Sequence, residues 1–247
     1  MPFLTRRNTV LESLRAGRRQ FKMLYLLESL SKKQSRPLMQ AANQAGVPIK
    51  TVNKGTLGNL AETGDHQGVV LEVGPYPYAN LDDILAFSAQ KGDMPLIVIF
   101  DLIQGTYNVG TLLRTAEIVG AHGVVMQERR APDISPQIVQ HSQGAAEHLK
   151  IAKVNNLVTA IEQMKAADIW VGGLDFGEDA VTWGEFDLNR PLALVVGHEG
   201  EGIRRLVRQT CDFILKLPQR GHVESLNAAV AGSVALYAAW QARGFAL

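Results

Sequence analysis

The sequence predicts an α/β protein in which a small N-terminal α/β unit precedes a larger domain with a mostly parallel sheet and helices on both faces. Two observations predict this fold class. From Pro95 onward, short apolar runs alternate with segments of helical spacing, and strands that alternate with helices form mostly parallel sheets. The composition is also that of an ordinary globular chain, with 46% hydrophobic and 20% charged residues among 247.

The stretch before Pro95 is predicted to form one small unit and a junction. Helical spacing covers 9–16, 35–46 and the region around Leu57, and apolar runs at 21–28, 47–52 and 68–73 are predicted strands. Two proline-bearing turns, GPYPY and KGDMP, then flank the polar helix LDDILAFSAQ, which indicates a domain junction. We therefore expect a first domain at 1–74, a linker at 75–94 and a second domain at 95–247.

The second domain contains five apolar runs that are predicted strands. LIVIF is continuous, as expected of a strand covered on both faces, and the others are GVVMQ, IWVGGL, LALVV and FILKL. Helical segments at 109–121, 155–167 and 203–210 lie between most of them. Ligands of such sheets bind beyond the carboxyl ends of the strands, so three loops at those ends are the candidate site.

Composition and spacing also exclude several classes of protein. Cys211 is the one cysteine, so no intramolecular disulfide can form and a reducing cytoplasmic location is expected; its thiol is more simply a buried small group than a nucleophile. No apolar run approaches the roughly 20 residues of a membrane span, and no signal peptide is recognisable. Four histidines could serve a metal hydrolase: His141, His148, His198 and His222. Because no metal-binding spacing accompanies them, we expect no metal.

Positive charge is concentrated at the N-terminal end. Residues 1–36 hold nine Lys or Arg and two Glu, a net charge of +7, although the whole chain carries only +1. Such a segment indicates either an anionic partner, most often nucleic acid, or a solvated helix face, and charge alone favours neither. The side chains that would contact phosphates are Arg6, Arg7, Arg15, Arg18 and Arg19.

The loop after LIVIF carries Asn108 and Arg114. Asn108 stands where a helix N-cap is expected, a structural role that asparagine often fills. Arg114 falls about one and a half turns into an otherwise apolar helix, and a charge in such a setting usually has a partner or a task. The pair nominates a site without identifying its chemistry.

The other two loops are rich in glycine and in capping residues. The segment GHEGEGIRR, which starts at Gly197, lets backbone N–H groups approach a ligand closely. Its spacing is neither the dinucleotide fingerprint nor a P-loop, and Glu199 and Glu201 would repel a polyphosphate, so an uncharged or cationic ligand suits it better. In the third loop, Ser225 and Asn227 precede a helix of small residues that suits close packing within the chain or across a dimer interface. Together the loops indicate a cofactor site.

With these residues in hand, the sequence closely resembles the SpoU family of RNA 2′-O-ribose methyltransferases, part of the SPOUT superfamily. The first family motif is similar to NVGTLLRTA, which contains Asn108 and Arg114. The second motif is similar to ALVVGHEGEGI, which contains Gly197, Glu199 and Gly202. The third motif is similar to LPQRGHVESLNAAVA, which contains Leu217, Ser225, Leu226 and Asn227. The stretches RNTVLESL and DHQGVVLEV resemble the substrate-binding domain of many members. The resemblance is strongest to the bacterial 23S rRNA guanosine-2′-O-methyltransferases.

This resemblance implies transfer of a methyl group from S-adenosylmethionine to a ribose 2′-hydroxyl of RNA. A guanosine of large-subunit rRNA is the first expectation, and tRNA is the alternative substrate. The implied catalytic residues are Arg114, Asn108, Glu199, Ser225 and Asn227, and the implied cofactor residues are Gly197, Leu217, Leu226 and Gly202. A C-terminal trefoil knot, a homodimer with the site at the subunit interface, and RNA contacts from the N-terminal arginines are also implied. The rival hypothesis is a non-catalytic RNA-binding dimer.

Two positions depart from this pattern. Relatives often have Asp-Pro where this chain has Thr106-Tyr107, and because Tyr107 lacks the rigid φ of proline, the approach to Asn108 is expected to differ or be looser. His198 stands where a small residue is expected, and a surface histidine is the simpler interpretation.

The implied role of Arg114 in activating the hydroxyl meets a difficulty, since a guanidinium with a pKa above about 12 stays protonated. The alternative is that Arg114 grips the adjacent phosphate and stabilises developing negative charge.

Overall fold

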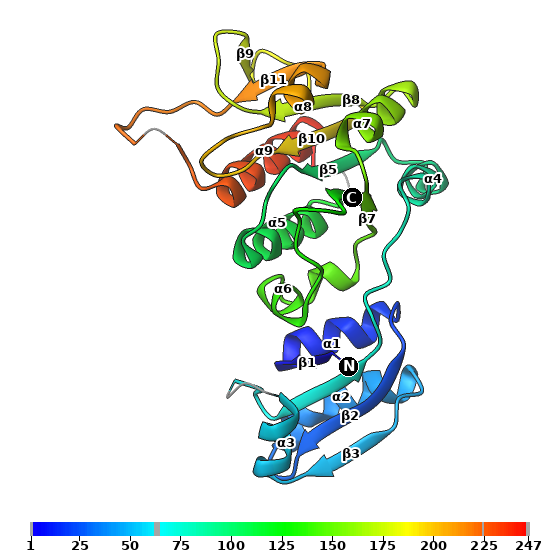
Figure 1. The fold of residues 1–247 in the computed structure, drawn as a ribbon. Coiled ribbons are helices and arrows are strands. Elements are labelled where there is room, and N and C mark those ends of the chain that lie inside the picture. Colours follow the sequence, from blue (N-terminus) through cyan, green and yellow to red (C-terminus); the bar gives the residue numbers. More distant parts are fainter. Residues whose placement is uncertain (1, 62–64, 224, 246–247) are drawn as a thin grey trace. The chain divides into compact units, whose positions relative to one another are not determined.

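The computed structural model describes residues 2–61, 65–223 and 225–245. The chain divides into two compact units (Figure 1). Unit 1 consists of the residues up to Pro77 together with Asp133–His148, and unit 2 consists of Tyr78–Pro132 and the residues from Leu149 onward. None of the helices in the described part of the chain has the length and hydrophobicity that a bilayer-spanning segment requires.

Unit 1 is built on a four-stranded sheet with the order β1-β4-β2-β3. Its strands are β1 (Phe3–Thr5), β2 (Phe21–Leu27), β3 (Ile49–Val52) and β4 (Val69–Val73), and its first three helices are α1 (Arg7–Ala16), α2 (Lys32–Gln44) and α3 (Lys54–Ala61). β4 runs antiparallel to β1 and β2, whereas β2 and β3 are parallel. The small N-terminal α/β unit predicted from the sequence is therefore confirmed.

The local sequence explains how α1 is held. Its buried residues, Thr9, Val10, Ser13 and Leu14, form one stripe along the helix, as an amphipathic surface helix requires. The helix ends at Gly17, whose φ of 63° is left-handed and whose N–H donates to the carbonyl of Ser13.

The segment Asp133–His148 completes unit 1 although it lies between two strands of unit 2 in the sequence. It contains α6 (Pro136–His141) and a 3₁₀ turn at Ala145–Glu147. Ser135 caps α6 by accepting a hydrogen bond from the N–H of Ile138, and Pro136 stands at the first helical position, where its missing N–H costs nothing.

Unit 2 is built on a seven-stranded sheet, as far as the described residues extend, with the order β7-β6-β5-β10-β8-β11-β9. The strands are β5 (Leu96–Phe100), β6 (Gly123–Gln127), β7 (Ile151–Val154), β8 (Trp170–Leu174), β9 (Ala180–Thr182), β10 (Leu192–Val196) and β11 (Phe213–Lys216). Every neighbouring pair is parallel. All five residues of β5 and of β10 are buried, as expected of strands covered on both faces.

Helices cover both faces of this sheet, which confirms the predicted architecture (Figure 1). The helices are α4 (Leu81–Lys91), α5 (Thr106–Ile118), α7 (Leu157–Ala166), α8 (Arg205–Thr210) and α9 (Ala228–Ala242). Side chains of α4, α7 and α8 share one apolar core with the sheet. On the other face α9 packs against α5 and β10. The contact is close because Gly232 has no side chain: a Cβ there would lie 3.0 Å from Val196 and still nearer to Leu112.

Candidate active site at the carboxyl ends of the strands

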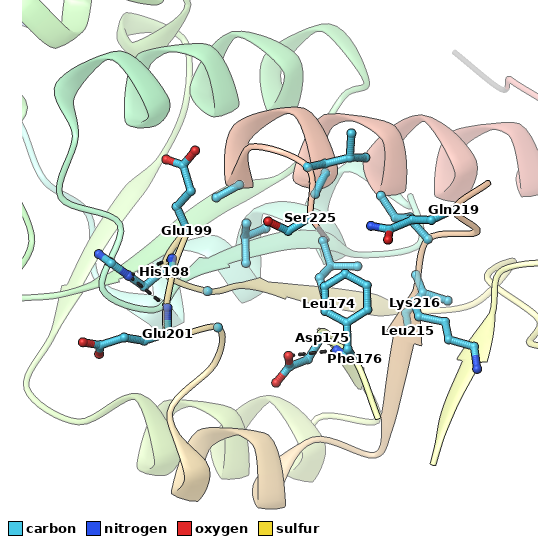
Figure 2. A pocket seen from close by; sticks show the side chains of 18 residues that line it. Leu174, Asp175, Phe176, His198, Glu199, Glu201, Leu215, Lys216, Gln219 and Ser225 are labelled. Carbon is cyan, nitrogen blue, oxygen red and sulfur yellow. Dashed lines mark hydrogen bonds between the residues drawn. The ribbon is translucent and has the colours of Figure 1, made fainter. Parts of the chain in front are cut away.

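A cavity of about 320 Å³ lies where β8, β10 and β11 end in unit 2 (Figure 2). Its apolar wall includes Leu174, Val196 and Leu215, the last or nearly last residues of those strands. The volume lies within the range of small-molecule sites, about 300–1,000 Å³. The cavity therefore stands where ligands of parallel sheets bind.

The second loop, which follows β10, forms the turn at the mouth of this cavity. His198 and Gly202 exchange two backbone hydrogen bonds of 2.9 and 3.0 Å. Gly197 must be glycine, because a Cβ at this position would lie 2.5 Å from the carbonyl oxygen of Gly202 and 2.6 Å from the nitrogen of Ile203. Gly202 adopts a left-handed φ of 67°, which glycine allows without strain.

His198 holds the same turn from inside. Its Nδ1 accepts hydrogen bonds from the backbone N–H groups of Gly200 and Glu201, at 3.1 and 3.2 Å (Figure 2). An imidazole nitrogen that accepts two N–H groups satisfies donors that the tight turn leaves without carbonyl partners. The structure thus gives His198 a loop-shaping role.

An ion pair that the sequence analysis did not identify anchors the end of this loop. The carboxylate of Asp101, which follows β5, is fully buried. It accepts a hydrogen bond from the backbone N–H of Arg204 at 2.8 Å and one from Nε of the same residue at 2.7 Å. Because the N–H of Asp101 in turn donates to the carbonyl of Val196, this aspartate fixes the first loop to both ends of the second.

The third loop, between β11 and α9, supplies the remaining wall. Leu217, Ser225 and Leu226 line the cavity. Asn227 is the N-cap of α9, and its Oδ1 accepts hydrogen bonds from the N–H groups of Ala229 and Val230. The cap leaves the side-chain N–H₂ of Asn227 directed away from the helix.

The three loops meet in a closed triangle of hydrogen bonds among Asn108, Glu199 and Asn227. Nδ2 of Asn227 donates to Oδ1 of Asn108 at 3.1 Å and to Oε1 of Glu199 at 2.9 Å. Nδ2 of Asn108 donates to Oε2 of Glu199 at 3.2 Å. Asn108 is therefore not a cap: α5 begins two residues before it, at Thr106, with Gly105 as N-cap. Its amide instead joins the first loop to the other two.

Arg114 stands apart from this triangle. It is exposed on α5, and its guanidinium makes no hydrogen bond or ion pair within residues 2–61, 65–223 and 225–245. Arg114 lies six positions after Asn108, which corresponds to about 9 Å along a helix axis and about 120° around it. The structure of one chain thus brings together Asn108, Glu199 and Asn227 but leaves Arg114 on another face of the helix.

The charge of the cavity suits a cationic ligand. Asp175, Glu199 and Glu201 line it, against the single lysine Lys216. S-adenosylmethionine carries a positively charged sulfur and an ammonium group, and the apolar wall can take up its adenine ring, so the residues present fit this cofactor. Asp175 and Phe176 follow β8 directly, and the same rule about strand ends that located the three loops could have identified them.

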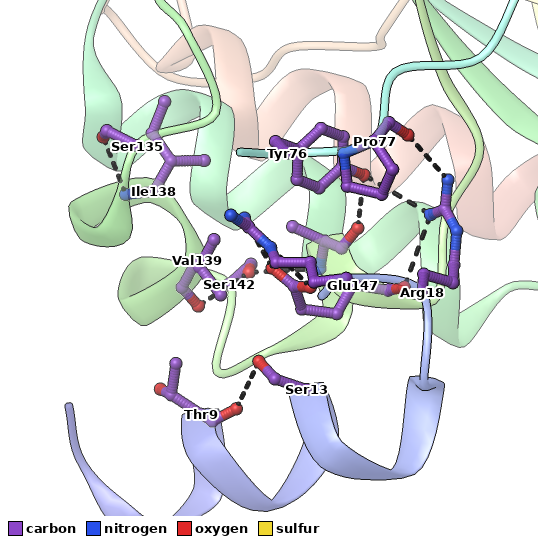
Figure 3. A network of polar contacts seen from close by, with 12 residues as sticks. Thr9, Ser13, Arg18, Tyr76, Pro77, Ser135, Ile138, Val139, Ser142 and Glu147 are labelled. Carbon is purple, nitrogen blue, oxygen red and sulfur yellow. Dashed lines mark hydrogen bonds and ion pairs between the residues drawn. The ribbon is translucent and has the colours of Figure 1, made fainter. Parts of the chain in front are cut away.

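The predicted RNA-binding arginines of unit 1 have different environments. Arg18 donates to the carbonyls of Pro77 and Glu147 at 3.1 and 3.3 Å (Figure 3). Arg6 pairs with Asp65 at 2.5 Å, and Arg15 with Glu12 at 2.7 Å. No hydrogen bond or ion pair of the Arg7 guanidinium is present in the described residues. These four positions stay predictions.

Arg19 is different, because its side chain is only 2% exposed and its Nη2 lies 2.8 Å from the buried carboxylate of Glu147. Nη1 of Arg19 also donates to the carbonyl of Gly74 at 3.2 Å. A guanidinium enclosed in this way does not face solvent, where a phosphate would meet it. This geometry therefore makes Arg19 a structural residue of unit 1 and does not support it as an RNA contact.

Comparisons with known proteins identify the family of this chain. Residues 95–237 match the model of the SpoU rRNA Methylase family, and residues 7–79 match that of RNA 2′-O ribose methyltransferase substrate binding. The chain is 40% identical over 239 residues to the TrmH-family protein YacO of Bacillus subtilis, covering 96% of this chain and 94% of the relative. It is 35% identical over 237 residues to a TrmH-family protein of Staphylococcus haemolyticus, covering 96% and 94%.

A solved structure gives a direct view of the cofactor in a similar protein. The SpoU methyltransferase AviRb of Streptomyces viridochromogenes, crystallised with S-adenosylmethionine, superimposes with a TM-score of 0.80 at 25% identity, over 99% of this chain and 91% of that one. An rRNA methyltransferase of Sinorhizobium meliloti shares the fold, with a TM-score of 0.79 at 22% identity, over 97% of this chain and 86% of that one.

Proposed function

We propose a specific reaction from the premise that the chain belongs to the SpoU family of RNA methyltransferases, whose cofactor is S-adenosylmethionine. The reaction is methylation of a ribose 2′-hydroxyl of RNA. The observation that carries this proposal is the triangle of Asn108, Glu199 and Asn227 at the mouth of the cofactor cavity. Its amide and carboxylate groups are suited to hydrogen-bonding a sugar, which supports a ribose site next to the cavity proposed for the methyl donor.

The chemistry assigns separate duties to the residues. The cofactor, when bound, supplies a methyl group on a positively charged sulfur. In the transfer the 2′-oxygen forms a bond to the methyl carbon, the carbon–sulfur bond breaks with its electron pair going to sulfur, and the hydroxyl proton passes to solvent. The triangle orients the ribose, Ser225 lines the cavity beside it, and positioning of this kind contributes up to about 7–11 kcal/mol. Arg114 holds the adjacent phosphate and stabilises charge on the oxygen.

The proposal includes a homodimer in which a second copy covers one face of α9. Val230, Val234 and Tyr237 are 46%, 37% and 44% exposed and recur with helical spacing. On α5, which packs beside α9, Ile118 is 48% exposed as well. Exposed apolar groups gathered in this way indicate a protein interface. Because Arg114 lies off the triangle of its own chain, a two-fold interface allows it to serve the partner's site.

Arg114→Ala tests the reaction. We expect it to abolish methyl transfer to an unmodified rRNA transcript while S-adenosylmethionine still binds with unchanged affinity in calorimetry. Glu117→Ala, on the same helix, is the matched control and should retain activity. Wild-type turnover by Arg114→Ala would refute the assignment, and absence of cofactor binding by the unmodified protein would favour a non-catalytic RNA-binding dimer.

Mixing two inactive variants tests the shared site. Arg114→Ala and Asn227→Ala each disable one component, and a heterodimer of the two has one intact site only if Arg114 acts across the interface. After subunit exchange the mixture should recover about one quarter of wild-type activity, because half of the dimers are mixed and each has one of two sites intact. No recovery, with exchange shown by differential labelling, would place both residues in the same chain's site.

The substrate belongs to the same proposal. We assign a guanosine of large-subunit rRNA first, and tRNA second, because the names of relatives cover both RNA classes. Mapping of 2′-O-methyl groups on rRNA and tRNA from a strain without the protein tests the choice.

A trefoil knot in the C-terminal segment is also proposed, supported by the position of β8 between the later strands β10 and β11. A cytoplasmic location stays a prediction.

A further inference from the structure

Several cations of unit 2 have internal partners, and at the carboxyl ends of the strands Arg204 pairs with Asp101 at 2.7 Å. At the amino ends of the strands, the protein itself engages further cations. Lys165 pairs with Asp212 at 2.8 Å. Arg243 donates to the carbonyls of Met94, Pro95 and Arg190, each at 2.8 Å. Each of these cations is therefore satisfied by an internal partner.

Aromatic rings engage three more cations at the same edge. The guanidinium of Arg190, before β10, lies 4.6 Å from the ring centre of Trp170. The ammonium groups of Lys91 and Lys150 lie 4.9 and 5.2 Å from the ring centre of Phe87. Such cation–π contacts are favourable and keep these side chains close to the surface.

Arg129 and Arg130 stand at the opposite edge and are different. They follow the carboxyl end of β6, and both are exposed. Neither has a hydrogen bond, an ion pair or a ring contact among the described residues. Arg130 has a left-handed φ of 70°, which costs a non-glycine residue of order 1 kcal/mol or more and is common at functional sites. With Glu128 before them, the loop keeps a net positive charge.

The sheet topology brings Arg129 and Arg130 next to the first loop, which follows β5 and leads to Asn108. β6 pairs in parallel with β5, and Met126 lies opposite Phe100. The loops after β6 and β5 therefore leave the sheet side by side, about 5 Å apart. β10, whose loop holds Glu199 and one side of the cofactor cavity, flanks β5 on its other side. Along this edge the order is cofactor cavity, then the loop that carries Asn108, then Arg129 and Arg130.

We propose that Arg129 and Arg130 form a phosphate-binding subsite for the RNA strand next to the methylated nucleotide. The inference rests on the proposed function and specifies where the substrate runs. A guanidinium has a planar fork of N–H donors that matches a phosphate, and a phosphodiester supplies the anionic partner that the chain itself does not provide. The strand passes from the 2′-hydroxyl near the triangle toward the end of β6, away from the cofactor.

The test removes the two charges and measures RNA binding against salt. The probe is a short fluorescein-labelled single-stranded RNA, and the variant is Arg129→Ala/Arg130→Ala. Each phosphate contact on a single strand contributes about 0.7 to the slope of log affinity against log salt, so between about 50 and 200 mM salt the wild-type affinity should fall about sevenfold more than that of the variant. The KM for an rRNA transcript should rise, with kcat at saturating RNA and cofactor affinity unchanged.

Two further variants keep the test specific. Lys91→Ala/Lys150→Ala removes the same charge at the amino edge and should keep the wild-type slope, whereas Arg129→Lys/Arg130→Lys should restore most of the lost slope. An alanine variant with the wild-type slope would overturn the subsite and leave only a solvated surface. If the wild-type protein methylates no RNA, the proposed function itself fails. This outcome can be told apart from failure of the phosphate-binding subsite, because it is measured on the wild-type protein alone.

Discussion

Replacing Glu147 by alanine removes the carboxylate that Arg19 meets inside unit 1. Nε of Arg19 lies 2.9 Å from both carboxylate oxygens, and Nη2 lies 2.8 Å from one of them. The two side chains are 2% and 1% exposed. The arginine would therefore remain buried without its counter-charge, although the carbonyl of Gly74 still accepts one of its N–H groups.

The burial sets the magnitude of the effect. Breaking a buried pair by removing one partner costs about 3–5 kcal/mol, a large part of the 5–15 kcal/mol that typically stabilises a domain. The exposed pair of Arg15 with Glu12 gives the contrast, because its side chains are 57% and 31% exposed and Arg15→Ala should cost less than about 1 kcal/mol. Unit 1 should thus unfold at much lower urea in Glu147→Ala than in Arg15→Ala.

Urea unfolding followed by circular dichroism measures these differences, and a double variant shows whether the loss comes from leaving one buried charge unpaired. Arg19→Met/Glu147→Leu removes both charges and keeps similar volume, so it should recover most of the stability that Glu147→Ala loses. A loss below about 1 kcal/mol in Glu147→Ala, or a double variant as unstable as the single one, would refute the reasoning. The double variant should also keep the wild-type salt dependence of RNA binding, because Arg19 is not presented to RNA.

Three other predictions follow from the geometry of unit 2. Gly197→Ala should abolish cofactor binding in calorimetry, because its Cβ would meet backbone at 2.5–2.6 Å, whereas Gly221→Ala, with nothing within 4 Å, should bind normally. Burial raises the pKa of the Cys211 thiol to about 12, so iodoacetamide at about pH 8 should modify it slowly until the protein is unfolded; rapid modification of folded protein would contradict this. Burial lowers the pKa of His122, whose Nδ1 accepts from the N–H of Leu96. The unfolded chain then binds the proton first, so stability should fall as pH drops below about 6.5, and His122→Gln should lose this slope in urea titrations at several pH values.

The sequence predicted the long strands of unit 2 and missed the short ones. The apolar runs correspond to β5, β6, β8, β10 and β11, because short runs of apolar residues bounded by helical or turn segments give a clear signal. β7 and β9 have the sequences IAKV and AVT, in which no more than two apolar residues stand in a row before a polar residue, so no apolar run marks them. Their pairing is set by neighbouring strands in the folded chain, which local sequence does not record.

The residue-level predictions for the candidate site came only from the family motifs. The expectation that Asn108 occupies a cap position was wrong, because α5 starts at Thr106 and the amide is bound to residues more than ninety positions away. Asp101 was missed for the same reason, since its partner Arg204 lies 103 positions away. Nor could the positive charge of the N-terminal segment show that Arg19 turns inward to Glu147, 128 positions further on.

Unit 1 is made of two separate stretches of the chain, which affects how the protein can be split into fragments or fused to another domain. A break in the backbone after Pro77 would yield two fragments, and the shorter would still find its complement in Asp133–His148 carried by the longer. Such fragments should reassemble, because the residues that make up the core of unit 1 are divided between them. A gene fusion that joined only the residues up to Pro77 to another catalytic domain would lack α6 for the same reason. The transferred unit would then expose the apolar surface next to β1 that α6 normally covers.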